Sequence, residues 1–190
     1  MDFILYTLAL VISYAFIGGG VKLLDHLTDQ PSQYQVSSFF LWVLTSSLAL
    51  VVVVWTLIDA YTAILALALV FGLIGAKKID TRFFLVLAFI IIPIGIISVF
   101  FQGVFLFLLP TLIALIPPVI LDELIHSYAT QITQPQMKWI LARRPLLKIT
   151  VIILPFFNLL TFTHTIAFWC FDITYDLVNY VFRASSKIET

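Results

Sequence analysis

Continuous apolar runs, rather than alternating apolar and polar positions, fill most of the chain. A membrane-spanning helix needs about 17–25 mostly apolar residues, whereas the strands of a transmembrane barrel alternate with a period of two. The runs therefore predict an all-α fold, a polytopic transmembrane helical bundle of about seven spans. The expected spans are Phe3–Leu24, Ser38–Ile58, Ala60–Ala76, Phe83–Phe101, Gly103–Leu121, Pro145–Thr161 and His164–Phe182.

The last apolar stretch, Pro145–Phe182, is too long for one span and barely long enough for two. We divide it at the polar residues in its middle because of where the basic residues then fall. With seven spans and an outer N-terminus, all ten Lys and Arg residues lie on the cytoplasmic side, as the positive-inside rule favours. With one long final helix, Arg183 and Lys187 would lie outside. The pattern thus predicts an outer N-terminus and a cytoplasmic C-terminus.

Composition agrees with a membrane location. Hydrophobic residues make up 62% of the 190 positions and charged residues only 11%, whereas soluble domains carry about 25% charged residues. The expected protein is a single transmembrane domain over residues 1–190, integral to the plasma membrane of a prokaryote, with membrane lipid as a partner. The formal net charge is zero, which gives no reason to expect a nucleic acid partner. Cys170 is the single cysteine, so a disulfide within the chain is excluded.

Most of the carboxylates fall on the cytoplasmic side in this topology. Two pairs, Asp25 with Asp29 and Asp172 with Asp176, are spaced four residues apart, so each pair shares one helix face. Paired carboxylates suit Mg²⁺, which proteins bind through one or two carboxylates together with substrate phosphates. The four aspartates are therefore candidate metal ligands.

Other polar residues on that side complete a candidate site. The candidates for binding phosphate groups are the lysines Lys22, Lys77 and Lys78. The candidates for a general base or a second metal site are Asp122, Glu123 and His126. The plainer interpretation of Lys22–Asp29, and of Asp122, Glu123 and His126, is that charges gather where a helix leaves the lipid for water.

Asp172 and Asp176 are harder to explain in that way, because they lie inside an otherwise apolar helix. A carboxylate there costs several kcal/mol unless it is paired or hydrated, so it is a functional-site hypothesis by default. The alternative is a structural ion pair. Its expected partners are Lys22, Lys77 or Lys78.

Three glycines, Gly18–Gly20, precede Lys22 in the first span. They permit either a close approach of a neighbouring helix or a deformed last turn. Either arrangement would carry Lys22 and Asp25 into a shared polar pocket. On the outer side, His164 is expected in a turn with no role in chemistry, and replacement of Asp59 is expected to have little effect.

The two DxxxD pairs at the cytoplasmic end of a helical bundle resemble the UbiA superfamily of intramembrane prenyltransferases. On this resemblance, Asp25 and Asp29 of KLLDHLTD correspond to the end of the family's first motif, NDxxDxxxD, and Asp172 and Asp176 of FDITYDL stand for the second. Val21 and Lys22 stand where the first motif begins with Asn-Asp. The resemblance implies Mg²⁺ as cofactor, an isoprenoid diphosphate as substrate, and transfer of the prenyl chain to an acceptor within the bilayer.

Three functions remain open at this point. The first is an Mg²⁺-dependent, prenyltransferase-like enzyme that acts on a lipid-linked diphosphate. The second is a small cation- or proton-coupled carrier, because carboxylates within the membrane also mark ion pathways. Against the carrier, the outer halves of the expected spans contain only weakly polar groups. The third is a non-catalytic membrane subunit or scaffold whose charges set the topology.

Overall fold

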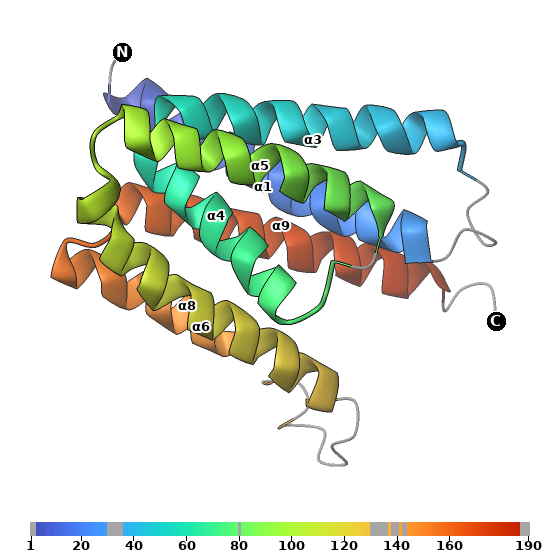
Figure 1. Ribbon diagram of the computed structural model, residues 1–190. Helices are drawn as coiled ribbons and strands as arrows, with labels where there is room; N and C mark the ends of the chain where they lie inside the picture. The colour runs from blue at the N-terminus through green and yellow to red at the C-terminus, as the bar shows by residue number, and fades with distance from the viewer. Residues whose placement is uncertain are drawn as a thin grey trace. The chain divides into compact units, whose positions relative to one another are not determined.

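The computed structural model describes residues 3–29, 36–79, 81–129, 137, 141 and 144–186. Its helices (Figure 1) are α1 (Phe3–Asp29), α3 (Ser38–Ile58), α4 (Ala60–Gly75), α5 (Arg82–Phe101), α6 (Phe105–Ala129), α8 (Pro145–Ile153), the 3₁₀ helix η1 (Leu154–Phe157) and α9 (Phe162–Ser186). These ranges contain no strand. The expected all-α fold is therefore confirmed, and a helix lies in each of the seven expected segments.

Four of the described helices, α1, α3, α5 and α6, are long and apolar enough to cross a membrane. The chain is accordingly an integral membrane protein. α4 and the α8–η1 segment are apolar but shorter. α9 has 25 residues, but polar side chains along it keep it out of the apolar set. The expected count of seven spans is thus matched in part.

The chain groups into two compact units. Unit 1 comprises Met1–Val54 and Ile166–Thr190, and unit 2 comprises Trp55–Thr165. The boundaries fall near the end of α3 and in the first turns of α9. The single domain expected over residues 1–190 remains a prediction.

In unit 1, α1 and α9 cross at a glycine. A Cβ atom added at Gly18 would collide with the backbone carbonyl of Phe171. The Thr174 hydroxyl donates a hydrogen bond to the Ala15 carbonyl at 2.8 Å. α1 stays helical to Asp29, so the close-approach interpretation of the glycines is confirmed, and the deformed turn is not found.

The contacts between α1 and α9 advance in the same direction along both helices. Ala15 bonds Thr174, Lys22 lies over the Tyr175 ring, and His26 stacks on Phe182 at 4.7 Å between ring centres. Within unit 1 these two helices therefore run parallel, and Figure 1 shows them as the blue and red ribbons.

In unit 2, α4 packs against both α5 and α6. A Cβ atom at Gly72 would collide with Val119 of α6, and one at Gly95 of α5 would lie 2.8 Å from Leu67 Cγ. These glycines bring the three helices close together. Half of α4 is buried as a result, including Ala63, Ile64, Leu67 and Ala68. The short α8 packs on α6.

Candidate functional site

Lys22 is the centre of the polar contacts between α1 and α9. Its Nζ lies 2.6 Å from Asp25 Oδ2 and 5.1 Å from the centre of the Tyr175 ring. A cation within about 6 Å of a ring centre is attracted to the face of the ring. Both charged side chains are largely buried, with 14% of Lys22 and 29% of Asp25 exposed. Lys22 therefore connects a carboxylate of α1 with an aromatic ring of α9.

Asp172 and Asp176 lie on either side of Tyr175 along α9, and both are half-buried. Asp29 belongs to the last turn of α1, but its side chain lies outside the described residues. Within the described part of the chain, no group of three or more His, Cys, Asp or Glu side chains could hold a metal ion. The expected ligand set of Asp25, Asp29, Asp172 and Asp176 remains a prediction.

Asp122 has a structural use in unit 2. Its Oδ1 accepts a hydrogen bond from the backbone N–H of Leu146 at 3.1 Å, and its Oδ2 accepts one from Leu147 at 2.7 Å. These are the second and third residues of α8, and the first, Pro145, has no N–H. A carboxylate from α6 therefore satisfies two of the free N–H groups that a helix presents at its start.

Glu123 holds the residue that precedes α8. Arg144 has a φ of 51°, a left-handed backbone conformation that residues other than glycine rarely adopt. Its Nη2 lies 2.7 Å from Glu123 Oε1, whose side chain is only 5% exposed. The two neighbouring acids thus fix the beginning of α8 together. Their expected role as a base or metal site, with the half-buried His126, remains a prediction.

Lys77 and Lys78 directly follow the end of α4. Lys77 has a φ of 56°, and the N–H groups of Lys77 and Lys78 donate to the carbonyls of Ile74 and Leu73 at 2.9 Å each. This is the Schellman ending, in which a left-handed residue closes the last turn of a helix. Both side chains are exposed. They belong to unit 2, whereas Lys22 belongs to unit 1.

A second polar cluster in unit 2 joins the beginnings of α4 and α9. His164 Nε2 lies 2.6 Å from Asp59 Oδ2, and His164 Nδ1 lies 2.6 Å from the Thr161 hydroxyl. Asp59 Oδ2 also accepts the backbone N–H of Thr62 at 2.6 Å, which caps α4. The side chains are buried, with 3% of His164 and 13% of Asp59 exposed. The expectation that His164 lies in an outer turn is wrong, because it occupies the first turn of α9.

This environment decides the ionisation of Asp59. Burial by itself would raise the pKa of the carboxyl group. The hydrogen bond and charge of His164 and the hydrogen bonds from Thr62 outweigh burial and lower the pKa below its ordinary value of 3.8. An opposite charge and N–H donors both favour the charged form of a carboxyl group. Asp59 is therefore an anion at neutral pH, and the expectation that its replacement has little effect no longer follows.

Sequence reasoning missed the cluster because its two halves are 105 residues apart. Two local signals were present. Asp59 stands directly before an apolar helix, and Thr161 stands directly before another. Asp and Thr are preferred at such positions because their oxygens accept the first N–H groups of the helix.

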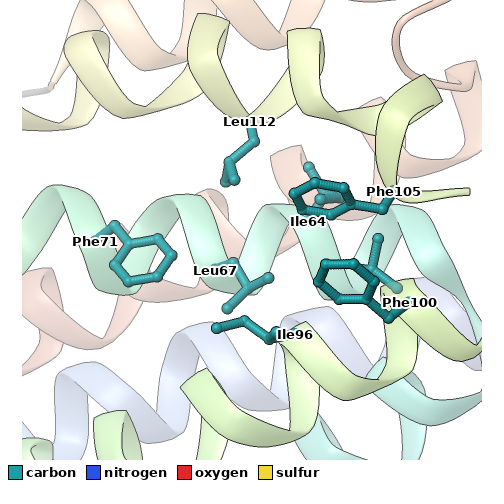
Figure 2. A pocket seen from close by; sticks show the side chains of 8 residues that line it. Ile64, Leu67, Phe71, Ile96, Phe100, Phe105 and Leu112 are labelled. Atoms are coloured by element: carbon teal, nitrogen blue, oxygen red, sulfur yellow. The ribbon is translucent and has the colours of Figure 1, made fainter.

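Unit 2 also contains an apolar pocket of about 210 Å³. Figure 2 shows that side chains from α4, α5 and α6 line it. Its walls are Ile64, Leu67, Phe71, Ile96, Val99, Phe100, Phe105 and Leu112. The rings of Phe100 and Phe105 stack at 4.4 Å. The lining contains no polar side chain, so it offers nothing that would orient a polar ligand.

No protein-family model, no curated protein and no solved structure matches the chain.

Proposed function

We propose that the α1–α9 pair binds a lipid-linked diphosphate together with Mg²⁺, and that the protein is a prenyltransferase-like membrane enzyme of the UbiA type. One observation carries the proposal. The Lys22–Asp25 pair lies against Tyr175, and the half-buried Asp172 and Asp176 flank Tyr175 on the parallel helix.

Helix geometry supports a shared site. The residues of α9 that contact α1 form one stripe: Phe171, Thr174, Tyr175, Val178 and Phe182. The matching stripe of α1 contains Ala15, Gly18, Gly19, Lys22 and His26. At 100° per residue, Asp172 lies about 100° from the centre of the α9 stripe, and Asp25 lies about 80° in the opposite sense from the centre of the α1 stripe. In two parallel helices that face each other, these opposite rotations lead to the same side of the pair. Along the helix axes, Asp25 lies three residues after Lys22 and Asp172 lies three residues before Tyr175, about 4.5 Å each in opposite directions, so a ligand that reaches both must extend along the helix pair.

The residue types fit a metal-bound diphosphate. Asp25, Asp172 and Asp176 offer the carboxylate oxygens that Mg²⁺ prefers, and Lys22 offers a cation for a phosphate oxygen. A bound metal ion would stabilise the charge of the leaving diphosphate. Asp122 and Glu123 already hold the start of α8, so we assign them no step.

Thermal melting in detergent tests the proposal, with farnesyl diphosphate as the probe. Binding stabilises by RT ln(1 + [L]/Kd), about 2.7 kcal/mol at a hundredfold excess over Kd. We expect stabilisation by Mg²⁺ and farnesyl diphosphate together, and its loss in Asp172→Asn and Asp176→Asn. Glu189→Gln, which removes a carboxylate from the C-terminal tail, is the control and should keep it. A wild-type melting temperature that does not change when Mg²⁺ and farnesyl diphosphate are added together would contradict the proposal.

The same variants separate a metal ligand from a structural ion pair. Without metal, clustered carboxylates repel each other, so Asp172→Asn should leave the free energy of unfolding equal or higher. If Asp172 were half of a buried ion pair, its loss would cost about 3–5 kcal/mol. A strongly destabilised Asp172→Asn protein with an unchanged response to ligand would therefore assign Asp172 to the architecture.

A further inference from the structure

The Asp59–His164–Thr161 cluster is separate from the residues of the proposed diphosphate site. It combines a carboxylate, an imidazole and a hydroxyl in one buried chain of contacts, each 2.6 Å long. Neither the capping of α4 nor the capping of α9 requires a histidine between the two caps. The position of His164 is therefore the feature to be explained.

The hydrogen bonds fix one proton of the cluster. Asp59 accepts a backbone N–H at the start of α4, where the helix dipole also favours a negative charge. An ionised carboxylate can only accept, so His164 Nε2 must carry the hydrogen that lies between them. The neutral imidazole is then the Nε2–H tautomer, and Nδ1 is free of a proton.

The second contact adapts to either state of Nδ1. A hydroxyl both donates and accepts. The Thr161 O–H donates to Nδ1 when the imidazole is neutral, and the Thr161 oxygen accepts from Nδ1–H when the imidazole is charged. That oxygen also accepts the backbone N–H of His164 at 3.3 Å, so it keeps a helix-capping bond in both states. Uptake of a proton therefore leaves both ring nitrogens and the Thr161 oxygen with a partner, while the Thr161 O–H turns away from Nδ1.

We propose that Asp59, His164 and Thr161 form a buried proton-binding site that gains and releases one proton at His164 Nδ1 while the fold stays intact. The bound proton turns a buried charge of −1 into a neutral ion pair. In the seven-span topology the α3–α4 link that carries Asp59 faces the outer side, so the proton would be exchanged there. The proposal is independent of the diphosphate site.

The groups that face His164 are few. Asp59 lies on the link before α4, and the Tyr61 ring of α4 lies 5.3 Å from the imidazole. Thr161 precedes His164, and the Thr165 hydroxyl donates to the Val151 carbonyl of α8 at 3.1 Å. Among the described residues, Asp59 and Tyr61 are the titratable side chains in contact with it. Asp59 is thus the carboxylate that faces His164, and its charge governs the site.

Nitrogen NMR on the full chain in detergent micelles, labelled with ¹⁵N-histidine, tests the proposal. The chain has three histidines, and His26→Gln and His126→Gln assign the His164 signals by elimination. At high pH we expect Nε2 protonated and Nδ1 unprotonated. As the pH falls towards 5, Nδ1 alone should gain a proton, while the backbone amide signals remain those of the folded protein.

Two substitutions at Thr161 provide a matched pair. Thr161→Val removes the hydroxyl, and an unpaired charged donor costs more than an unpaired neutral acceptor. At the pH where wild-type His164 is half protonated, the protonated population should fall at least threefold in Thr161→Val and stay the same in Thr161→Ser. The wild-type spectra decide the matter even if Thr161→Val does not fold. A neutral His164 with its proton on Nδ1, or a His164 whose protonation is constant from pH 9 to pH 5, would overturn the proposal.

Discussion

Carboxylates at the beginnings of helices make the main polar contacts of unit 2. Asp59 caps its own helix, α4, whereas Asp122 reaches across from α6 to cap α8. In both cases the oxygens accept N–H groups that have no partner within the helix, and the helix dipole favours the negative charge. Removing such a cap typically costs about 1 kcal/mol. The burial of both side chains raises this figure, because an N–H group left without an acceptor there has no water to bond.

Asp59→Asn should therefore destabilise the protein in a pH-dependent way. At pH 7 we expect the free energy of unfolding to fall by about 1–3 kcal/mol, since the neutral amide leaves His164 with a weaker partner. The pKa of Asp59 is lowered in the folded state. Its contribution is thus fully present above the ordinary pKa of 3.8 and is lost as the pH falls through the lower folded value.

Unfolding in detergent at pH 7 and at pH 3 measures this difference. The gap between wild type and Asp59→Asn should change between the two pH values, because the charge of Asp59 and that of its partner His164 both contribute to it, and Glu189→Gln is the control. An equal gap at both would mean that the carboxylate charge at Asp59 contributes nothing to stability.

Residues such as Asp59 and His164 mark the limit of what the sequence predicts about the site. Spacing along one helix is readable, and the i,i+4 pairs follow directly from it. Contacts between residues far apart in the chain depend on which helices pack together, and apolar runs alone do not specify this. Lys22 illustrates the point, because its bond to Asp25 three residues later was readable from spacing, whereas its contact with Tyr175 was not.

At the scale of helices, the crossing of α1 and α9 depends on a single missing side chain. Membrane helices associate through close packing and small residues, because lipid gives them no hydrophobic reason to pair. Gly18 lets the backbone of α1 reach the backbone of α9 at Phe171. The bond from Thr174 to the Ala15 carbonyl forms at the same place. The glycine thus brings Lys22 and Tyr175 into contact one turn further along.

Gly18→Ala and Gly19→Ala form a matched pair for this crossing. The added methyl group at Gly18 meets backbone atoms that cannot yield, so we expect a loss of about 1–3 kcal/mol in the free energy of unfolding. At Gly19 the new Cβ would lie 3.6 Å from Val178 Cγ2, an ordinary contact. Alanine is the better helix former by about 1 kcal/mol, so Gly19→Ala should be neutral or stabilising. Equal effects of the two variants in a detergent melting assay would argue against the crossing.

The helices themselves were the predictable part of the fold. Their starts at Phe3, Ser38, Ala60 and Pro145 follow from the onset of apolar runs, and each lies where the sequence places it. Their ends were harder, because α6 continues through Asp122 and His126 to Ala129. The expected end at Leu121 assumed that charge stops a membrane helix. The Asp122 carboxylate is paired with backbone N–H groups, so it does not need to leave the helix for water.

For the whole molecule, the direction of α9 restricts the number of membrane crossings. α4 spans 16 residues, about 24 Å at 1.5 Å per residue, which is less than the hydrocarbon thickness of about 30 Å. Either α4 and α8–η1 both cross as short, buried helices, giving seven crossings, or neither crosses, giving five with α9. Both counts are odd, so both place the two ends of the chain on opposite sides of the membrane. An odd count is required because α1 and α9, the first and last helices, run parallel within unit 1. Six crossings would place them on the same side.

The link after α4 distinguishes seven crossings from five. With seven it is cytoplasmic, and with five it is outside, together with Lys77, Lys78 and Arg82. We expect seven crossings, because the positive-inside rule favours a cytoplasmic position for these three basic residues. Lys77 is a suitable labelling site because its side chain is exposed. Lys77→Cys in a Cys170→Ala background leaves one thiol to label with a membrane-impermeant maleimide. It should be protected in intact cells and labelled in inside-out vesicles, while a cysteine added before Phe3 should behave in the opposite way. Labelling of Lys77→Cys in intact cells would establish five crossings and would place Lys77 and Lys78 on the outer side of the membrane.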